Sequence, residues 1–523
     1  MGWIEELSRL RTVFTPPAAT QVENLLEQAD ASPIADAATL IAFHETLLFL
    51  RAYPHSPRVV ELTERLLGGF ARRVEALADS EREALEEPEV SGIAGTSLSA
   101  IFTYPVARWL AQAHPGEIEI DWERHEREAR LGSALPRFVP LLAEDSLVEA
   151  HPPYTEWLEA AGGNLAWLIR QLERSSLPYE RKAEVYDSME LPLRWRLGSG
   201  PSTRTKTRLP APEIYCHTAP LLKRSDISLD AEVTAPPLPL TGLSRAEGET
   251  LLALTRDTSA VRYRELLGFT HGDPAAVWRA PSERGVEIYL WGVPPARRLP
   301  LRAYHAGMMF KNGVPVGYVE GLSFIERMEV GFNLYYTFRE GETAWLYARL
   351  LRLLRQVAGV TCFSIDPYQI GHENEEAIDS GAFWFYRKLG FRPVEPEIAR
   401  LMETEERKVK SRPGYRTPPH ILRRLAAGSM IYESPGVPRG DWDRFAVRNL
   451  GLAVNRRRRR VRGEGLALVV SLIPGLARWP AADKTALDGI LRAKTGRDEA
   501  VYLRRMQRHA RLREALLALG SAD

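Results

Sequence analysis

Apolar positions recur at helical spacing through residues 1–200, which predicts a mainly helical N-terminal domain. The clearest series runs from Val59 to Phe70 and follows Ser56-Pro57, where a serine cap and a proline in the first turn predict a helix start. Similar spacing predicts helices over 38–50, 97–111 and 164–172. His44 lies within an apolar stretch, which indicates a core histidine.

Residues 201–240 have a different composition, with prolines and glycines near both ends, which predicts an interdomain connection. Gly200 to Thr207 has the outline of a phosphate-binding loop. Because Thr205 replaces the second glycine and no clear strand precedes it, a basic linker is the favoured interpretation. Residues 213–217 are expected to form a short strand.

Strand patterns begin near residue 286 and are separated by short turns. Asn312-Gly313 stands between two apolar runs, a strong signal for a β-hairpin. We therefore expect an antiparallel meander. Its strands are expected at Val286–Trp291, Leu301–Lys311, Val314–Phe324 and Met328–Tyr336.

An amphipathic helix is predicted from Ala344 to Val357 and a buried parallel strand from Val360 to Ile365. A helix over 380–389 and a strand beginning at Phe391 follow. The fold class is therefore α/β (α+β). The predicted domains are 1–200, 201–240, 241–400 and a helical, charged region over 401–523.

Two short segments within this region resemble a known family. Phe338 to Ala344 joins a strand to a helix, and Phe385 to Phe391 reads Phe-Tyr-Arg-Lys-Leu-Gly-Phe. With the order of the elements around them, residues 284–395 resemble the GNAT superfamily of N-acetyltransferases. The resemblance implies a GNAT-like mixed sheet with flanking helices, and acetyl-CoA or another acyl-CoA as cosubstrate, with no metal.

The resemblance also implies the residues that would bind coenzyme A. In the family a glycine-rich turn holds the pyrophosphate at a helix N-terminus, and the preceding strand receives the pantetheine arm. Glu342 replaces the central glycine, so a carboxylate would face the anion unless the turn is remodelled. The residues concerned are Leu334, Tyr336, Arg339, Gly341, Glu342, Thr343 and Ala344.

The implied reaction transfers an acyl group from the thioester to a small-molecule or peptide amine. The amine needs a base, for which Glu329 and Glu320 are the candidates, with His372 a weaker one. Tyr386 stands where the family often places the acid that protonates the leaving thiolate. Asp366 is expected only to start the turn at Pro367.

Composition limits the remaining possibilities. The 523 residues carry a net charge of +1, which argues against a dedicated nucleic-acid-binding protein. Only Cys216 and Cys362 occur, which favours a reducing compartment, and the N-terminus resembles no signal peptide. A cytoplasmic protein without a membrane partner is expected.

Arg456 to Arg460 predict a solvated face or, alternatively, a contact with a phosphate-rich partner. Two functions other than acyl transfer from acyl-CoA are alternatives. One is a non-catalytic scaffold that senses acyl-CoA or binds proteins. The other is a transferase that uses aminoacyl-tRNA.

Overall fold

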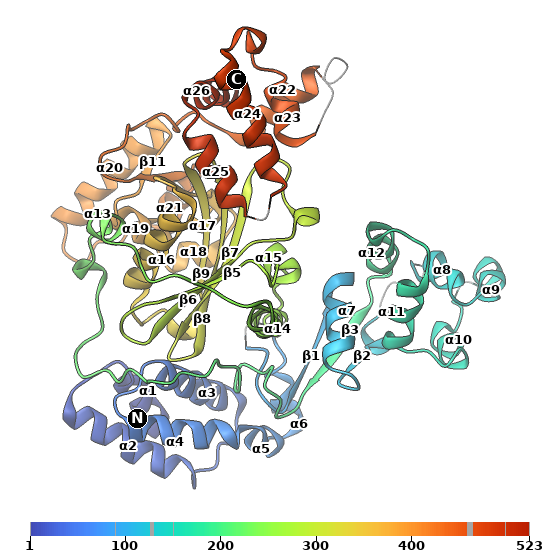
Figure 1. Ribbon diagram of the computed structural model, residues 1–523. Helices are drawn as coiled ribbons and strands as arrows, with labels where there is room; N and C mark the ends of the chain where they lie inside the picture. Colours follow the sequence, from blue (N-terminus) through green and yellow to red (C-terminus); the bar gives the residue numbers. More distant parts are fainter. Residues whose placement is uncertain are drawn as a thin grey trace. The chain divides into compact units, whose positions relative to one another are not determined.

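The computed structural model describes residues 2–88, 90–125, 130–149, 151–457, 464–496 and 498–521. The chain forms two compact units (Figure 1). The first unit contains Met1–Ala219 and Thr250–Thr270, and the second contains Pro220–Glu249 and His271–Asp523. Both helices and strands are abundant, so the fold is mixed α/β as predicted.

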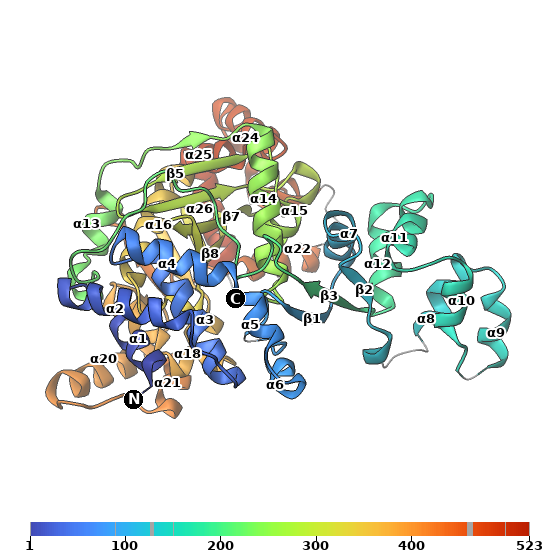
Figure 2. The same ribbon diagram turned by 90° about the horizontal axis from the view of Figure 1, so that it is seen from below.

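The first unit begins with four helices that pack side by side (Figure 2). Ser56 caps the fourth as predicted, because its hydroxyl accepts a hydrogen bond of 3.2 Å from the N–H of Val59. The predicted helix over 38–50 is also present, with slightly wider bounds. The four helices are α1 (Trp3–Leu10), α2 (Pro16–Ala29), α3 (Ala37–Ala52) and α4 (Pro57–Gly68).

The first unit also contains a sheet that the sequence pattern did not predict. Among the described residues it has three strands in the order β1 (Thr96–Ile101), β3 (Pro192–Leu197) and β2 (Ile118–Ile120). The single helix expected over 97–111 was therefore wrong: β1 comes first and α7 (Tyr104–Ala113) follows. The strand nature of β1 depends on antiparallel pairing with β3, which is distant in sequence.

Helices cover the rest of this part of the chain. Helix α11 begins after Asn164, whose side chain accepts from the N–H of Trp167, and this agrees with the helix predicted there. Other helices of the first unit are α5 (Phe70–Glu75), α6 (Asp79–Glu83), α8 (Leu131–Ala134), α9 (Leu142–Val148), α10 (Tyr154–Ala160), α11 (Leu165–Arg174) and α12 (Tyr179–Ser188).

The segment predicted to be a basic linker lies instead in the interior of the first unit. Thr205 is fully buried, and its hydroxyl lies 2.9 Å from Nε2 of His44 and 2.9 Å from the N–H of Ala94, which donates to it. Arg204 donates to the buried carboxylate of Glu45 at 2.7 Å. The Thr205 hydroxyl and the Arg204 guanidinium thus have polar partners in the interior, which lowers the cost of burying a hydrophilic sequence.

The second unit is built on a mixed sheet. Among the described residues its order is β11-β12-β10-β9-β8-β7-β6-β5-β4, antiparallel except for the pair β9 and β10. Its strands are β4 (Thr241–Gly242), β5 (Val277–Pro281), β6 (Val286–Trp291), β7 (Ala303–Lys311), β8 (Val314–Phe324), β9 (Arg327–Leu334), β10 (Cys362–Ile365), β11 (Arg392–Pro393) and β12 (Met430–Glu433).

The predicted meander is confirmed. The hairpin between β7 and β8 turns at Asn312-Gly313, where both residues have positive φ, 50° and 77°, as a tight primed turn requires. The predicted parallel strand is β10. By contrast, residues 213–217 form no strand, and β12 interrupts a region predicted to be helical.

Helix α16 (Thr343–Ala358) is the predicted amphipathic helix, and it packs with α13 (Leu229–Thr234) in the second unit (Figure 1). Glu232 of α13 pairs with Arg349 at 3.3 Å and with Arg352 at 2.8 Å. Residues 220–240, expected to be a connection, are thus packed against α16.

Helices α14 (Arg245–Ala260) and α15 (Leu267–His271) precede β10 and cross the boundaries between the two units in sequence, and the other helices of the second unit follow β10. Short helices precede β11, and longer ones surround β12 and complete the C-terminal region. They are α17 (Pro367–Ile370), α18 (Glu375–Asp379), α19 (Ala382–Lys388), α20 (Pro396–Ser411), α21 (Pro419–Leu425), α22 (Val447–Arg457), α23 (Gly465–Val470), α24 (Ala481–Lys494), α25 (Glu499–Gln507) and α26 (Ala510–Ser521).

Candidate functional site

The parallel strands β9 and β10 separate soon after they meet. Their described register pairs Arg327–Glu329 with Cys362–Ser364. Strand β9 continues to Leu334, whereas β10 ends at Ile365 and the chain turns at Asp366-Pro367 into α17. One edge of β9 therefore extends beyond its parallel partner from Val330 onward.

The backbone groups on this edge follow from the pairing of β9 with β8. The N–H of Tyr335, directly after β9, donates to the carbonyl of Val316 in β8 at 2.9 Å. Because successive residues of a strand direct their backbone groups to opposite edges, Val330, Phe332 and Leu334 present theirs to the side where β10 has ended. A partner that lies along β9 would pair with these groups.

The side chain of Gln369, from α17, occupies part of that edge. Its Nε2 donates to the carbonyl of Val330 at 3.0 Å, and its Oε1 accepts from the N–H of Phe332 at 3.2 Å. One carboxamide thus satisfies one acceptor and one donor of the strand, as a neighbouring strand would. Gln369 could not be predicted from the sequence, since a single glutamine after a strand carries no distinctive signal.

Tyr386 of α19 lies beside this carboxamide. Its hydroxyl donates to Oε1 of Gln369 at 3.5 Å, and the side chain is buried, which raises the pKa of the phenol. Tyr347 of α16 packs edge-on against Tyr386, with ring centroids 5.6 Å apart. The buried hydroxyl of Tyr347 has no hydrogen-bond partner in the described part of the chain. The predicted acid therefore stands at the separation of the strands.

The two candidate bases lie on one face of the sheet. Glu320 of β8 is directly opposite Gly331 of β9, and Glu329 precedes Gly331 by two residues, so alternation places both carboxylates on the same side. A Cβ at Gly331 would lie 3.5 Å from Nε2 of Gln369 and 3.9 Å from the Cβ of Glu320. Glu320 and the carboxamide thus both border the space where a side chain at Gly331 would lie.

The surroundings of the two carboxylates differ. Glu320 accepts a hydrogen bond from the hydroxyl of Tyr304, and burial raises its pKa. The side chain of Glu329 is 38% exposed and lies 3.6 Å from the guanidinium of Arg302. A carboxylate with a raised pKa is better matched to accepting a proton near neutral pH, which favours Glu320 as the base.

The turn predicted to hold a pyrophosphate has an ordered conformation. A short 3₁₀ turn over Tyr336–Phe338 leads to Arg339, and the N–H of Gly341 donates to the carbonyl of Phe338 at 2.9 Å. Thr343 and Ala344 begin α16. Tyr336 is 42% exposed, whereas Leu334 is buried.

Arg339 closes the far end of the exposed β9 edge. Its Nε donates to the carbonyl of Leu334 at 3.4 Å, and its guanidinium donates to Glu376 at 2.6 Å. The Thr343 hydroxyl donates to the Arg339 carbonyl at 3.0 Å and fixes the turn to the helix start.

Glu342 is not directed at the turn but is buried, with 1% of its surface exposed. Nε of Arg284 donates to it at 3.0 Å, the N–H of Leu222 donates at 3.1 Å, and Nζ of Lys311 lies 3.9 Å away. The expectation that this carboxylate faces a bound anion is therefore corrected: its charge is compensated in the interior. Arg284 and Lys311 were missed, because their pairing with Glu342 joins distant parts of the sequence.

Burial also affects Lys311. It lowers the pKa of the ammonium to about 7, although the carboxylate of Glu342 acts in the opposite direction. The ammonium donates a hydrogen bond to the carbonyl of Arg284. Glu342 and the two cations thus form one buried cluster that fixes the start of α16.

The weaker candidates have structural or exposed positions. Asp366 accepts from the N–H of Tyr368 at 2.9 Å and so starts α17, as expected. His372 is exposed in the turn after α17. Of the arginine run, Arg456 lies at the end of α22, and Arg458–Arg460 fall outside the described residues.

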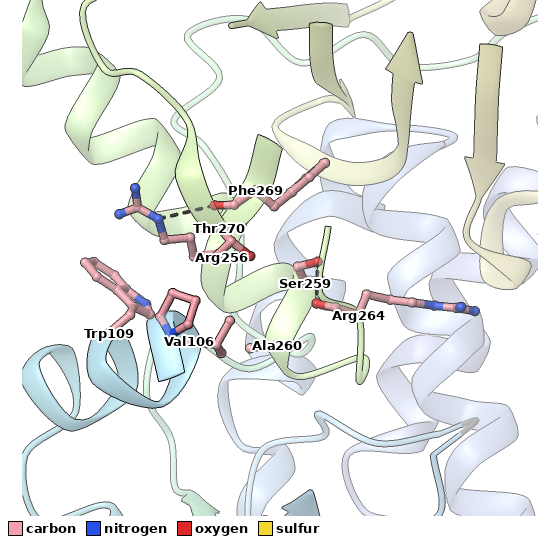
Figure 3. A pocket seen from close by; sticks show the side chains of 9 residues that line it. Val106, Trp109, Arg256, Ser259, Ala260, Arg264, Phe269 and Thr270 are labelled. Carbon is pink, nitrogen blue, oxygen red and sulfur yellow. Dashed lines mark hydrogen bonds between the residues drawn. The ribbon is translucent and has the colours of Figure 1, made fainter. Parts of the chain in front are cut away.

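A small cavity in the first unit is too small for a substrate. It measures about 10 Å³, room for about one water molecule. Trp109 and Arg256 line it, with the guanidinium 4.9 Å from the Trp109 ring and donating to the carbonyl of Phe269 (Figure 3). These contacts stabilise the wall of the cavity.

Comparison with known protein families, curated proteins and solved structures found no match to this chain. Within the described ranges, no group of three or more His, Cys, Asp or Glu side chains is arranged to hold a metal ion. In the same ranges, no helix has the length and apolar character needed to cross a membrane.

Proposed function

We propose that the chain is an acyl-CoA-dependent N-acyltransferase with a GNAT-like catalytic domain in the second unit. The observation that carries this proposal is the separation of β9 from β10, with Tyr386 hydrogen-bonded to Gln369 on the edge that it exposes and Glu320 across β9 from that edge, on β8 opposite Gly331. An extended chain bearing amide groups, such as the pantetheine arm of coenzyme A, could pair with this edge as a strand would.

The burial of Glu342 supports the proposal. Its side chain makes no hydrogen bond that caps α16 among the described residues, and its charge is compensated by Arg284 and Lys311. Glu342 stands in the cap position of α16, but its carboxylate is paired with Arg284 and Lys311 instead of with the first-turn N–H groups, so a phosphate could approach those groups.

The proposed reaction is direct. The amine nitrogen forms a bond to the thioester carbonyl carbon, and the bond from that carbon to sulfur breaks as the tetrahedral intermediate collapses. Glu320 accepts the proton that the amine loses, directly or through a water molecule, and Tyr386 donates its proton to the leaving thiolate. Backbone N–H groups of the exposed β9 edge are the candidates to stabilise the oxyanion.

Calorimetric titration of the full chain with acetyl-CoA tests binding, and release of free CoA over a panel of amines tests turnover. We expect Tyr386→Phe to lower turnover at least tenfold while changing acetyl-CoA affinity less than threefold, because the lost proton acts after binding. Tyr289→Phe, a phenol on β6, is the matched control.

Equal losses in affinity and turnover would make Tyr386 a binding residue. Binding without turnover over the amine panel would favour the acyl-CoA-sensing scaffold. Absence of any binding heat would overturn the proposal.

A further inference from the structure

The position of Gln369 suggests how the exposed edge of β9 is closed when no ligand is bound. Its carboxamide offers one N–H donor and one carbonyl acceptor in a plane, the same pair that a peptide or pantetheine amide offers. The N–H donates to the carbonyl of Val330 and the carbonyl oxygen accepts from the N–H of Phe332, both on β9. A chain added to this edge requires these same two backbone groups.

The neighbours of Gln369 leave the carboxamide close to the reacting groups. Gly331 has no side chain, and a Cβ there would meet Nε2 of Gln369 at 3.5 Å. The same carboxamide accepts the hydrogen bond of Tyr386 at 3.5 Å. Gln369 therefore contacts both the edge of β9 and the proposed acid.

We propose that Gln369 is an internal plug: it occupies the β9 edge in the free protein and leaves when the amide of an acyl-CoA pantetheine arm takes its two hydrogen bonds. This inference rests on the proposed function for the identity of the ligand. Displacement of the carboxamide also frees the hydroxyl of Tyr386 from its resting partner, so ligand binding and exposure of the acid are coupled.

The plug has a physical advantage over an empty edge. Unpaired backbone groups at the end of a buried sheet cost free energy, and an exposed edge can pair with another chain. A side-chain carboxamide satisfies the groups but is held by weaker constraints than a strand. It can therefore be replaced without unfolding β9 or β10.

The test combines hydrogen exchange with calorimetry on the full chain. In Gln369→Ala the amide of Phe332 should exchange at least tenfold faster than in the unsubstituted protein, because its acceptor is lost. Acetyl-CoA should bind this variant about three- to tenfold more tightly, because displacing two hydrogen bonds of modest net strength is no longer required. Saturating acetyl-CoA should restore slow exchange at Phe332.

Two further variants separate the possible causes. Gln369→Leu keeps much of the side-chain volume but cannot hydrogen-bond, so it should also accelerate exchange at Phe332. Tyr368→Ala, at an exposed neighbour on α17, should change neither exchange nor affinity.

Unchanged exchange in Gln369→Ala would overturn the plug whatever the ligand does. Weaker acetyl-CoA binding in that variant would also overturn it, because Gln369 would then be a ligand contact. If exchange at Phe332 accelerates but acetyl-CoA binds none of the variants, both the proposed function and the displacement of Gln369 by acyl-CoA are refuted. The closure of the β9 edge by Gln369 then still stands.

Discussion

Removal of the Glu342 carboxylate should destabilise the second unit rather than improve a binding site. In Glu342→Gln the guanidinium of Arg284 loses a charged partner at 3.0 Å. Breaking a buried ion pair from one side costs about 3–5 kcal/mol. Since the Arg284 side chain is 19% exposed and retains some hydration, we expect the lower end, about 3 kcal/mol.

Lys311 moderates this cost. Burial lowers the pKa of Lys311 to about 7, even though the Coulombic attraction of Glu342 raises that pKa. At pH 7.5 Lys311 is therefore already largely neutral, and without the carboxylate its pKa falls further, so it adds little uncompensated charge. Lys311→Met combined with Glu342→Gln should therefore lose less stability than the sum of the single changes, a coupling that a double-mutant cycle measures.

Hydrogen exchange of the amides of α16 is the suitable assay, because a chain of two units need not unfold in one transition. A loss of about 3 kcal/mol corresponds to roughly 150-fold faster exchange in amides that open with the unit. The control Glu340→Gln, at an exposed neighbour in the same turn, should change stability by less than about 0.5 kcal/mol.

Unchanged α16 exchange together with tighter acetyl-CoA binding in Glu342→Gln would mean that the carboxylate faces the ligand, and it would refute the assignment of Glu342 to the buried cluster.

Three other predictions follow from buried polar groups. The pKa of Lys311 is lower in the folded chain than in the unfolded chain, so the unfolded state binds more protons above pH 7. The free energy of unfolding should therefore rise between pH 7 and 9. Lys311→Met should remove this rise when denaturant unfolding is measured over a series of pH values. In the unsubstituted protein the acidic limb of the turnover–pH profile should lie above the usual pKa range of a carboxyl group, because burial raises the pKa of Glu320. Glu320→Gln should remove this limb and lower turnover at least tenfold. Glu329→Gln should change turnover less than threefold. Thr205→Val should destabilise the first unit by about 2 kcal/mol, measured by urea unfolding, because it leaves buried His44 without its hydroxyl partner.

Sequence patterns predicted the elements whose signals are local. The hairpin at Asn312-Gly313 needs positive φ at both residues, and few other dipeptides allow it, so its position and the bounds of β8 could be predicted. The helix after Ser56 could be predicted for the same reason, since the cap lies within one helical turn of Val59 and the apolar spacing is internal to the segment. These features depend on neighbouring residues.

The missed elements depend on partners far away in sequence. Strand β12 is four residues long and lies in a charged region, and its neighbours β10 and β11 precede it by many residues. Strand β1 carries apolar spacing compatible with a helix, and only pairing with β3 selects the extended form. Composition alone gives no sign of either pairing.

Buried polar groups were the least predictable feature. Arg204, Thr205 and Glu342 have the residue types of solvated turns, yet all three are buried. Each is satisfied by a group that sequence proximity does not indicate, such as His44 for Thr205 or Lys311 for Glu342. A polar residue indicates a need for partners, not a place on the surface.

Two internal side chains stand at the two ends of the proposed ligand path, and they have opposite consequences for binding. Gln369 is held on the β9 edge by neutral hydrogen bonds that an amide can replace at little net cost. Glu342 is held in the interior by Arg284 and Lys311, and its removal would leave the Arg284 guanidinium without its charged partner. Under the proposed function, a ligand that enters therefore displaces Gln369 and leaves Glu342 in place. By its sequence position the Glu342 carboxylate would oppose an anion at the turn, but it instead preserves the α16 start at which the proposed anion would bind.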